Sequence, residues 1–234
     1  MAALVTLLAL GVALASGPAD LTQAADANLT EDDRMALFHA MVADYPRNRP
    51  WLEEIAADDA HNARERWVAV RVLGQTGHPD AKAPLLALCL DPMPAIRAAA
   101  AASLGDLGDK SVTQQLAKML QDAAIIVRAA AADSLGQLKD AATVGPLTDA
   151  LWDTDSFYRG QSVWARRHYV DALGEIGSAK ALPALVRGLE DTDPNVVTSS
   201  LSALRKINGY DFAEGRTREE HIEAWRRWAM NEGL

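Results

Sequence analysis

The sequence contains little cysteine and few aromatic residues. Of its 234 residues only Cys89 is a cysteine, and aromatic residues make up 6% of the chain. A single cysteine excludes an intramolecular disulfide and a zinc site built on several thiolates. Because Cys89 stands in the apolar run LLALCL, we expect it to be a small core residue.

Positive charge is also scarce. Lys and Arg number 23 against 32 Asp and Glu, so the formal net charge is −9 at pH 7. A chain with this balance repels a phosphate backbone rather than attracting it. The composition therefore argues against nucleic acid as a partner.

Motifs that carry known chemistries are missing as well. The five histidines include no pair four residues apart, and none is followed directly by glutamate, which excludes the usual helical zinc motif. No nucleophile elbow, P-loop or dinucleotide-binding glycine motif occurs. Adjacent acids such as Asp32-Asp33, Glu53-Glu54 and Glu219-Glu220 suit helix N-termini or solvated faces, although a hydrolytic pair among them stays a weaker alternative. We predict no catalytic, cofactor-binding or metal-binding residues, no cofactor, and a protein that is not an enzyme.

Alanine and leucine dominate the chain, which favours helices, and a repeat organises them. Four Leu-Gly pairs begin at Leu73, Leu104, Leu135 and Leu173, at spacings of 31, 31 and 38 residues. Leu204 lies 31 residues further on and is followed by arginine instead of glycine. Seven residues before these five leucines stand Arg66, Arg97, Arg128, Arg166 and Val197.

Each repeat reads as two helices, the first over about 97–107 and the second over about 111–121. The first helix ends at Gly77, Gly108 or Gly177, and Lys139 takes that place once, which predicts a strained or different cap there. Runs of alanine let neighbouring first helices approach closely. The sequence therefore predicts an all-α fold, a right-handed α-solenoid (superhelix) of stacked helix pairs with a period of about 31 residues.

The stretch from Asp91 to Asp109, with IRAAAAASLGDLG at its centre, resembles HEAT repeats of the short kind named after the phycobilin lyases. The resemblance covers about 66–210, and degenerate helices extend it back to Glu31. It implies a polar ladder through the solenoid that caps helices and joins repeats. By motif position its members are Asp91, Asp122 and Asp153 with Arg97, Arg128 and Arg166, and Val197 interrupts it.

The N-terminal stretch MAALVTLLALGVALASG is apolar and ends with Ala13 and Ala15 in the spacing of a signal-peptidase site. It is shorter than a membrane-spanning helix. We expect a cleaved signal peptide, with an uncleaved anchor or a buried helix as alternatives. The protein is then expected to be periplasmic or secreted, and it is membrane-anchored if the segment stays uncleaved as an anchor. The expected organisation is 1–16 signal peptide or anchor, 17–30 linker, 31–65 degenerate helical repeat or cap, 66–210 HEAT-like repeats with an insertion at 154–167, and 211–234 C-terminal capping helix.

The C-terminal piece leaves the period. Thr217 with Glu220 three residues later predicts a capping box for a helix over 218–231. Trp225 and Trp228 lie on one face of that helix. We expect this helix to cap the open end of the stack, and an aromatic binding box is the alternative.

Positions that vary while the repeat frame stays fixed are the candidates for binding. In the second helices, two leucine-rich columns belong to the core, whereas two others change from repeat to repeat and should face outward. The resemblance implies that second helices line the concave surface, where such proteins bind partners. The insertion adds aromatic residues and is either a lid or a recognition loop. The candidate partner-binding residues are Lys118, Gln121, Asp149, Trp152, Phe157, Tyr158, Trp164, Arg187 and Glu190.

Trp152 has a second interpretation, because it is also suited to packing beneath the insertion. The sequence predicts a monomeric, non-catalytic scaffold that binds another protein outside the cytoplasm, with no membrane span once the signal is removed. The alternative implied by the resemblance is a ligand-handling protein or chaperone similar to the bilin lyases, with a tetrapyrrole in the concave groove. Partner identity is not readable from the sequence.

Overall fold

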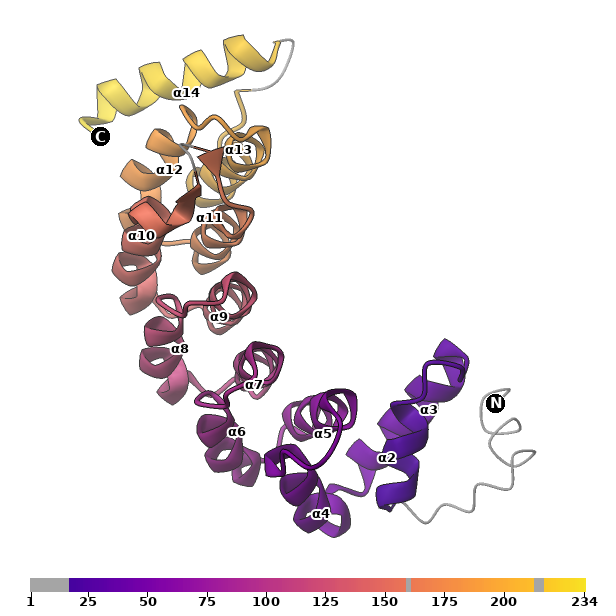
Figure 1. Cartoon of the computed structure of the whole chain (residues 1–234). Helices are drawn as coiled ribbons and strands as arrows, with labels where there is room; N and C mark the ends of the chain where they lie inside the picture. Colours follow the sequence, from indigo (N-terminus) through magenta and orange to yellow (C-terminus); the bar gives the residue numbers. More distant parts are fainter. Residues whose placement is uncertain (1–16, 159–160, 213–216) are drawn as a thin grey trace. The chain divides into compact units, whose positions relative to one another are not determined.

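The computed structural model describes residues 17–158, 161–212 and 217–234, and these form two compact units (Figure 1). Unit 1 ends at Gly108 and unit 2 begins at Asp109. Residues 1–16, for which a signal peptide or anchor is predicted, lie outside the described part of the chain.

Unit 1 consists of helices joined by short turns. In chain order they are α2 (Pro18–Ala24), α3 (Glu31–Ala43), α4 (Tyr45–Ala57), α5 (Ala63–Gln75), the 3-10 turn η1 (Pro79–Ala81), α6 (Lys82–Leu88) and α7 (Pro94–Asp106). Helix α5 packs against both α4 and α7, and α6 packs on α7.

Unit 2 continues the repeat and adds one small hairpin. Its elements are η2 (Lys110–Val112), α8 (Thr113–Met119), α9 (Ile125–Leu138), η3 (Ala141–Thr143), α10 (Val144–Trp152), η4 (Thr154–Ser156), β1 (Phe157–Tyr158), β2 (Gln161–Ser162), α11 (Ala165–Ile176), η5 (Ala179–Ala181), α12 (Leu182–Gly188), α13 (Pro194–Asn208) and α14 (Arg218–Glu232). The strands pair antiparallel inside the insertion, with Phe157 opposite Ser162. Apart from this hairpin the described residues form helices, turns and loops, so the fold class is the all-α solenoid that the period predicts.

The leucines of the repeat form the core. Leu85, Leu116, Leu147 and Leu185, one in each second helix, are 0% exposed, which confirms the inward column of the sequence pattern. The following column of Cys89, Leu120, Leu151 and Leu189 is also buried. The second helices of both units therefore bury the same two columns of side chains.

Each second helix begins later than the pattern suggests, because a 3-10 turn precedes it. The side chains of His78, Asp109, Asp140 and Ser178 each accept a hydrogen bond from the backbone N–H two residues on. This bond closes the tight turn that follows the first helix. The helix predicted over 111–121 is accordingly α8, Thr113–Met119.

Left-handed residues end the first helices as predicted. Gly108 and Gly177 have φ of 70°, and Lys139 has φ of 50° in the same position. Lys139 is the one non-glycine residue with positive φ in the described part of the chain, and glycine adopts this conformation at lower cost. The cap at Lys139 is thus the strained member of the series.

Small residues set the spacing between first helices. In unit 2, α9 packs on α11 and α11 packs on α13 (Figure 1). A Cβ added at Gly174 would lie 2.8 Å from the Ala203 Cβ, and one at Gly136 would lie 3.0 Å from the Ala172 Cα. Helices α8, α10 and α12 make few direct contacts with one another. Because the first-helix row is the more closely spaced, it forms the inner side of unit 2.

The polar ladder exists with a different pairing from the expected one. The carboxylate of Asp91 pairs with Arg66, and that of Asp191 pairs with Arg166, each from the preceding repeat. Arg97, in contrast, donates to the main-chain carbonyl of Asp91 at 2.8 Å, six residues before it. The sequence spacing of six is therefore a contact with backbone, whereas the ion pairs join repeats across 25 residues.

The arginines of these ion pairs also hold the end of the preceding helix. Arg66 Nε and a terminal nitrogen donate to the Ala56 carbonyl oxygen, both at 3.0 Å, and Arg166 Nε donates to the Leu151 carbonyl oxygen at 3.0 Å. Both arginine side chains are almost completely buried. Each arginine thus joins three segments, and these bonds and ion pairs offset part of the cost of burying its charge.

The N-terminal boundary differs from the expectation of a polar linker over 17–30. Pro18–Ala24 form α2, which packs against α3 and α5. Leu21 and Ala24 lie three residues apart and are buried together, and so this short helix has one apolar face. Two apolar residues in a polar stretch are too weak a pattern to reveal it.

The C-terminal helix α14 packs against α12 and begins at a capping box. Thr217 accepts from the Glu220 N–H at 3.3 Å, and the Glu220 carboxylate accepts from the Thr217 N–H at 2.8 Å. Trp225 is fully buried, with the rings of Phe212 and Trp228 edge-on at 4.8 and 5.2 Å. This aromatic cluster covers apolar surface and does not form an open box.

In the ranges that the structure describes, no helix combines the length and the apolar character needed to cross a bilayer.

Candidate functional site

The variable columns of the second helices face outward. Lys118, Asp149 and Arg187 are exposed, as are Gln121 and Glu190 in the neighbouring column. Leu90 precedes Gln121 in that column and is 80% exposed, whereas Trp152 is half-buried. The orientation predicted from the sequence is confirmed, and the role of these residues in binding stays a prediction.

Four of the nine candidates come together in one groove of unit 2. This groove, the Trp152 groove, has a volume of about 310 Å³. It lies where α10, the insertion and the end of α12 meet. Its lining residues are Trp152, Phe157, Arg187, Glu190, Asp191 and Thr192.

Two guanidinium groups contact the indole of Trp152. The Arg187 Cζ lies 3.9 Å from the indole centroid and the Arg166 Cζ lies 4.8 Å from it. Arg166 also lies over the Phe157 ring, at 4.2 Å from its centroid. A guanidinium is attracted to the negative face of an aromatic ring, so the contacts fix the indole and the insertion in place.

The two arginines differ in what they can still bind. Arg166 is buried and its guanidinium pairs with Asp191, so it serves as the floor of the Trp152 groove. Arg187 is exposed, and within the described residues it makes no ion pair. On the rim, the Glu190 carboxylate Oε1 lies 3.6 Å from the Arg226 Nη2 of α14. Arg187 is therefore the groove's available cation, with a planar fork of donors.

The remaining candidates lie elsewhere. Lys118 and Asp149 are exposed on α8 and α10 but do not line the Trp152 groove, and Gln121 borders a separate small cavity beside Arg128. Tyr158 is 65% exposed at the hairpin. Trp164 is 50% exposed and packs edge-on against His168, whose ring lies 2.8 Å from Asp133 on α9. The insertion thus places Phe157 in the Trp152 groove and Trp164 against His168, which contacts α9.

The expectation that second helices line the concave surface is wrong for unit 2. The first helices are the closely spaced row, because Gly136 and Gly174 allow backbone contact there. The candidate columns therefore lie on the more open, outer row. Sequence periodicity cannot distinguish the two sides, because both rows bury a leucine-rich face.

The sequence singles out one cysteine and several adjacent acids as groups that could carry chemistry. Burial raises the pKa of the Cys89 thiol to about 12, so the thiol is not a ready nucleophile. Among the adjacent acids, Glu53 pairs with Arg49 at 2.7 Å and Asp33 accepts from the Thr30 hydroxyl at 2.7 Å. Within the described ranges, no three His, Cys, Asp or Glu side chains converge as metal ligands would. Glu53 and Asp33 therefore have structural partners.

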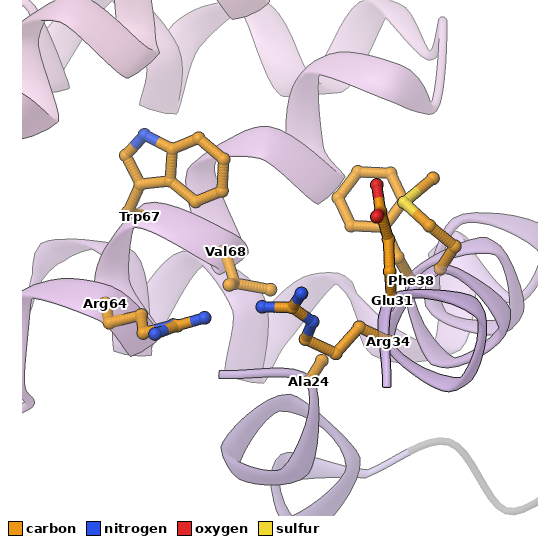
Figure 2. A pocket seen from close by; sticks show the side chains of 8 residues that line it. Ala24, Glu31, Arg34, Phe38, Arg64, Trp67 and Val68 are labelled. Atoms are coloured by element: carbon orange, nitrogen blue, oxygen red, sulfur yellow. The ribbon is translucent and has the colours of Figure 1, made fainter. Parts of the chain in front are cut away.

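Sequence reasoning missed a second hollow, in unit 1. This hollow, the Trp67 pocket, has a volume of about 200 Å³ between α2, α3 and α5 (Figure 2). It is lined by Ala24, Glu31, Arg34, Met35, Phe38, Arg64, Trp67 and Val68. One signal was available in the sequence. The residue after each repeat arginine is alanine in the next two repeats, whereas after Arg66 it is Trp67.

The sequence profile of HEAT repeats matches residues 49–125, 89–165 and 159–217, which together cover well over half of the chain. The chain therefore belongs to the HEAT repeat family. No curated protein sequence is similar enough to match it.

Solved structures show the same fold. Escherichia coli YibA is 22% identical, with a TM-score of 0.57, over 88% of this chain and 81% of YibA. A designed armadillo repeat protein in complex with a (KR)4 peptide is 18% identical, with a TM-score of 0.52, over 82% of this chain and 99% of the designed one. The CpcE–CpcF phycocyanin lyase of Nostoc sp. is 19% identical over 89% and 94%, and its TM-score of 0.38 is too low to support an inference.

Proposed function

We propose that this HEAT repeat protein is a non-catalytic scaffold that binds a protein partner outside the cytoplasm, with the Trp152 groove as its principal contact. The observation that supports the proposal is the exposed Arg187 guanidinium stacked 3.9 Å from the indole centroid of Trp152. Tryptophan and arginine are the residues that most often dominate the binding energy of protein interfaces.

The way the groove is built suits binding without rearrangement. Arg166 holds the indole from below, through its own bonds to Leu151 and Asp191. A side chain fixed before binding loses little conformational entropy when a partner arrives. Phe157 and Thr192 line the same groove as Trp152.

The partner chemistry follows from the charges. Arg187 lacks an ion pair within the described residues and presents parallel N–H donors, which match a carboxylate in two-point contact. Lys118 lies on α8 in the equivalent column and is also exposed. Asp149 and Glu190 add negative charge to the same row, so the partner surface needs charges of both signs. This row therefore favours a partner surface with complementary charges of both signs over a polymer that carries charge of one sign.

Site-specific photo-crosslinking tests this assignment. Thr192 in the groove is replaced by p-benzoylphenylalanine in the full chain, which is expressed and irradiated in its native cells. We expect one dominant covalent adduct, identified by mass spectrometry. The matched control carries the same residue at Gln137, which is exposed on α9 in the first-helix row and should give no such adduct.

Two variants decide whether the groove itself carries the contact. Trp152→Ala removes the indole, and Arg187→Glu reverses an exposed charge that makes no ion pair within the described residues. Each should reduce the Thr192 adduct about tenfold or more, as expected for a hot-spot residue. Equal adducts from Thr192 and Gln137, or an adduct that survives both substitutions, would contradict the proposal.

The extracytoplasmic location is supported by the apolar N-terminal stretch alone. If 1–16 acts as a signal peptide, the mature chain begins just after the Ala13-x-Ala15 site. N-terminal sequencing of the protein recovered from the native envelope fraction tests this. Recovery from the cytoplasm with Met1 intact would rule out export.

A further inference from the structure

We infer that the Trp67 pocket of unit 1 binds a peptide segment in which a carboxylate stands beside a bulky apolar side chain. The occupant is a partner segment inserted between α3 and α5. This site is separate from the Trp152 groove and does not depend on the function proposed for unit 2.

Two arginines converge in this pocket. Arg34 comes from α3 and Arg64 from α5, and Figure 2 shows their guanidinium groups pointing toward one another, between Val68 and Ala24 in this view. Within the described part of the chain neither side chain forms an ion pair. Two like charges that face each other repel, so an anion placed between them relieves repulsion and gains charge-assisted hydrogen bonds.

The other wall of the pocket is apolar and open to solvent. Trp67 is 44% exposed and Met35 is 45% exposed, and Phe38 of α3 also lines the pocket. Exposed large apolar side chains gathered at one hollow mark a surface that another molecule covers. In Figure 2 the indole of Trp67 and the ring of Phe38 stand on opposite sides of the opening.

The size of the pocket selects the kind of occupant. About 200 Å³ is below the roughly 300–1,000 Å³ typical of sites for whole cofactors or small molecules. It suits a single bulky side chain, with the adjoining carboxylate reaching the two guanidiniums. A free anion such as phosphate would use the arginines and leave the apolar wall uncovered, so the combination favours an acidic, apolar peptide.

Glu31 is the one acidic residue that lines the pocket. In Figure 2 its side chain extends in a different direction from that of Arg34, which reaches toward Arg64. Nearby Glu65 is 3.3 Å from His61 and does not line the pocket. Glu31 therefore repels an acidic peptide at the rim, and its removal should strengthen binding.

Fluorescence anisotropy with three matched peptides tests the inference on the full chain. Each is a labelled Gly-Ser peptide with a central Glu-Phe-Glu, Gln-Phe-Gln or Glu-Ala-Glu. We expect binding of Glu-Phe-Glu that is about tenfold tighter than that of either control, because the controls lack the charge or the apolar side chain. Inorganic phosphate at equal concentration should not compete.

Variants assign the binding to this pocket. Arg34→Gln and Arg64→Gln should each weaken Glu-Phe-Glu binding about tenfold, and Trp67→Ala should do the same. Glu31→Gln should tighten it by roughly two- to fivefold. These positions are exposed or half-buried, and unchanged circular dichroism verifies the fold of each variant.

Trp152→Ala in unit 2 is the matched control and should leave peptide binding unchanged. Equal affinity for Glu-Phe-Glu and Gln-Phe-Gln, no measurable binding of either, or full binding by the Arg34→Gln, Arg64→Gln double variant would overturn the inference. Equally effective competition by phosphate would indicate a simple anion site instead and would also overturn it. None of these outcomes bears on the Thr192 crosslink, so this inference and the proposed function fail separately.

Discussion

The two helix rows of unit 2 belong to the same repeat but differ in how closely their helices pack and in which side chains they expose. In the first-helix row, glycine and alanine bring α9, α11 and α13 into direct contact. In the second-helix row, α8, α10 and α12 stand further apart and expose side chains that change with each repeat. One row therefore holds the stack together, while the other is free to vary.

This difference shows why the variable columns are the better guide to function. A residue in the close-packed row is constrained by the neighbouring backbone, so its identity reflects packing. A residue such as Arg187 in the open row has no such constraint, and its identity reports on what it meets from outside. Trp152 is intermediate between these two kinds of position. Its indole is half-buried, and it contacts both the buried Arg166 of the first-helix row and the exposed Arg187 of the second-helix row.

The two arginines on Trp152 give the largest expected contrast. Arg166→Met leaves the Asp191 carboxylate, 3% exposed, without its ion-pair partner, and we expect a loss of about 3–5 kcal/mol in unfolding free energy. Arg187→Met removes only an exposed stacking contact and should cost less than about 1 kcal/mol. Urea denaturation followed by circular dichroism measures both.

A double variant separates charge from packing in that comparison. Arg166→Met combined with Asp191→Asn removes both charges and should recover part of the loss, because no unpaired carboxylate stays buried. Similar stabilities for Arg166→Met and Arg187→Met would show that the ion pair does not hold the repeats together.

Two glycines give a smaller contrast in the size of the effect. Gly174 in the first-helix row has no room for a Cβ, which would meet the Ala203 Cβ at 2.8 Å, so Gly174→Ala should destabilise by about 1–3 kcal/mol. In α10, an added Cβ at Gly145 would meet no other part of the chain within 4 Å, so Gly145→Ala should change stability by less than about 1 kcal/mol, because the helix propensity of alanine is opposed by the crowding of its Cβ against Pro146. Thermal unfolding of the two variants side by side should show the larger loss of stability for Gly174→Ala. Stabilisation by both substitutions would mean that the first helices are not in close contact.

Much of the fold could be predicted because the repeat is regular. The period fixes which leucines are buried, and Leu116, Leu147 and Leu185 are all 0% exposed. It also predicts the unusual cap at Lys139, since glycine is replaced there within an otherwise fixed frame. Where the frame is lost, prediction fails. Helix α2 and the α3 side of the Trp67 pocket lie in the degenerate N-terminal region, where no neighbouring repeat shows which positions are variable, and comparison with later repeats marks Trp67 alone.

The ladder shows a different limit. Spacing along the chain suggested that each aspartate pairs with the arginine six residues later, and the structure pairs Asp91 and Asp191 with arginines 25 residues earlier. In a stack, the nearest charge in space often belongs to the adjacent repeat. A register of this kind depends on how far one helix pair is displaced relative to the next, which no single repeat encodes.

The sequence by itself determined the all-α repeat, its buried leucine columns and the outward direction of the variable positions, because helical periodicity is a local property of the chain. Only the tertiary structure decided which row of unit 2 lies inside, which arginine pairs with which aspartate, and that Trp152 and Arg187 share a groove. These depend on distances between helices, which are set when small side chains on neighbouring repeats meet.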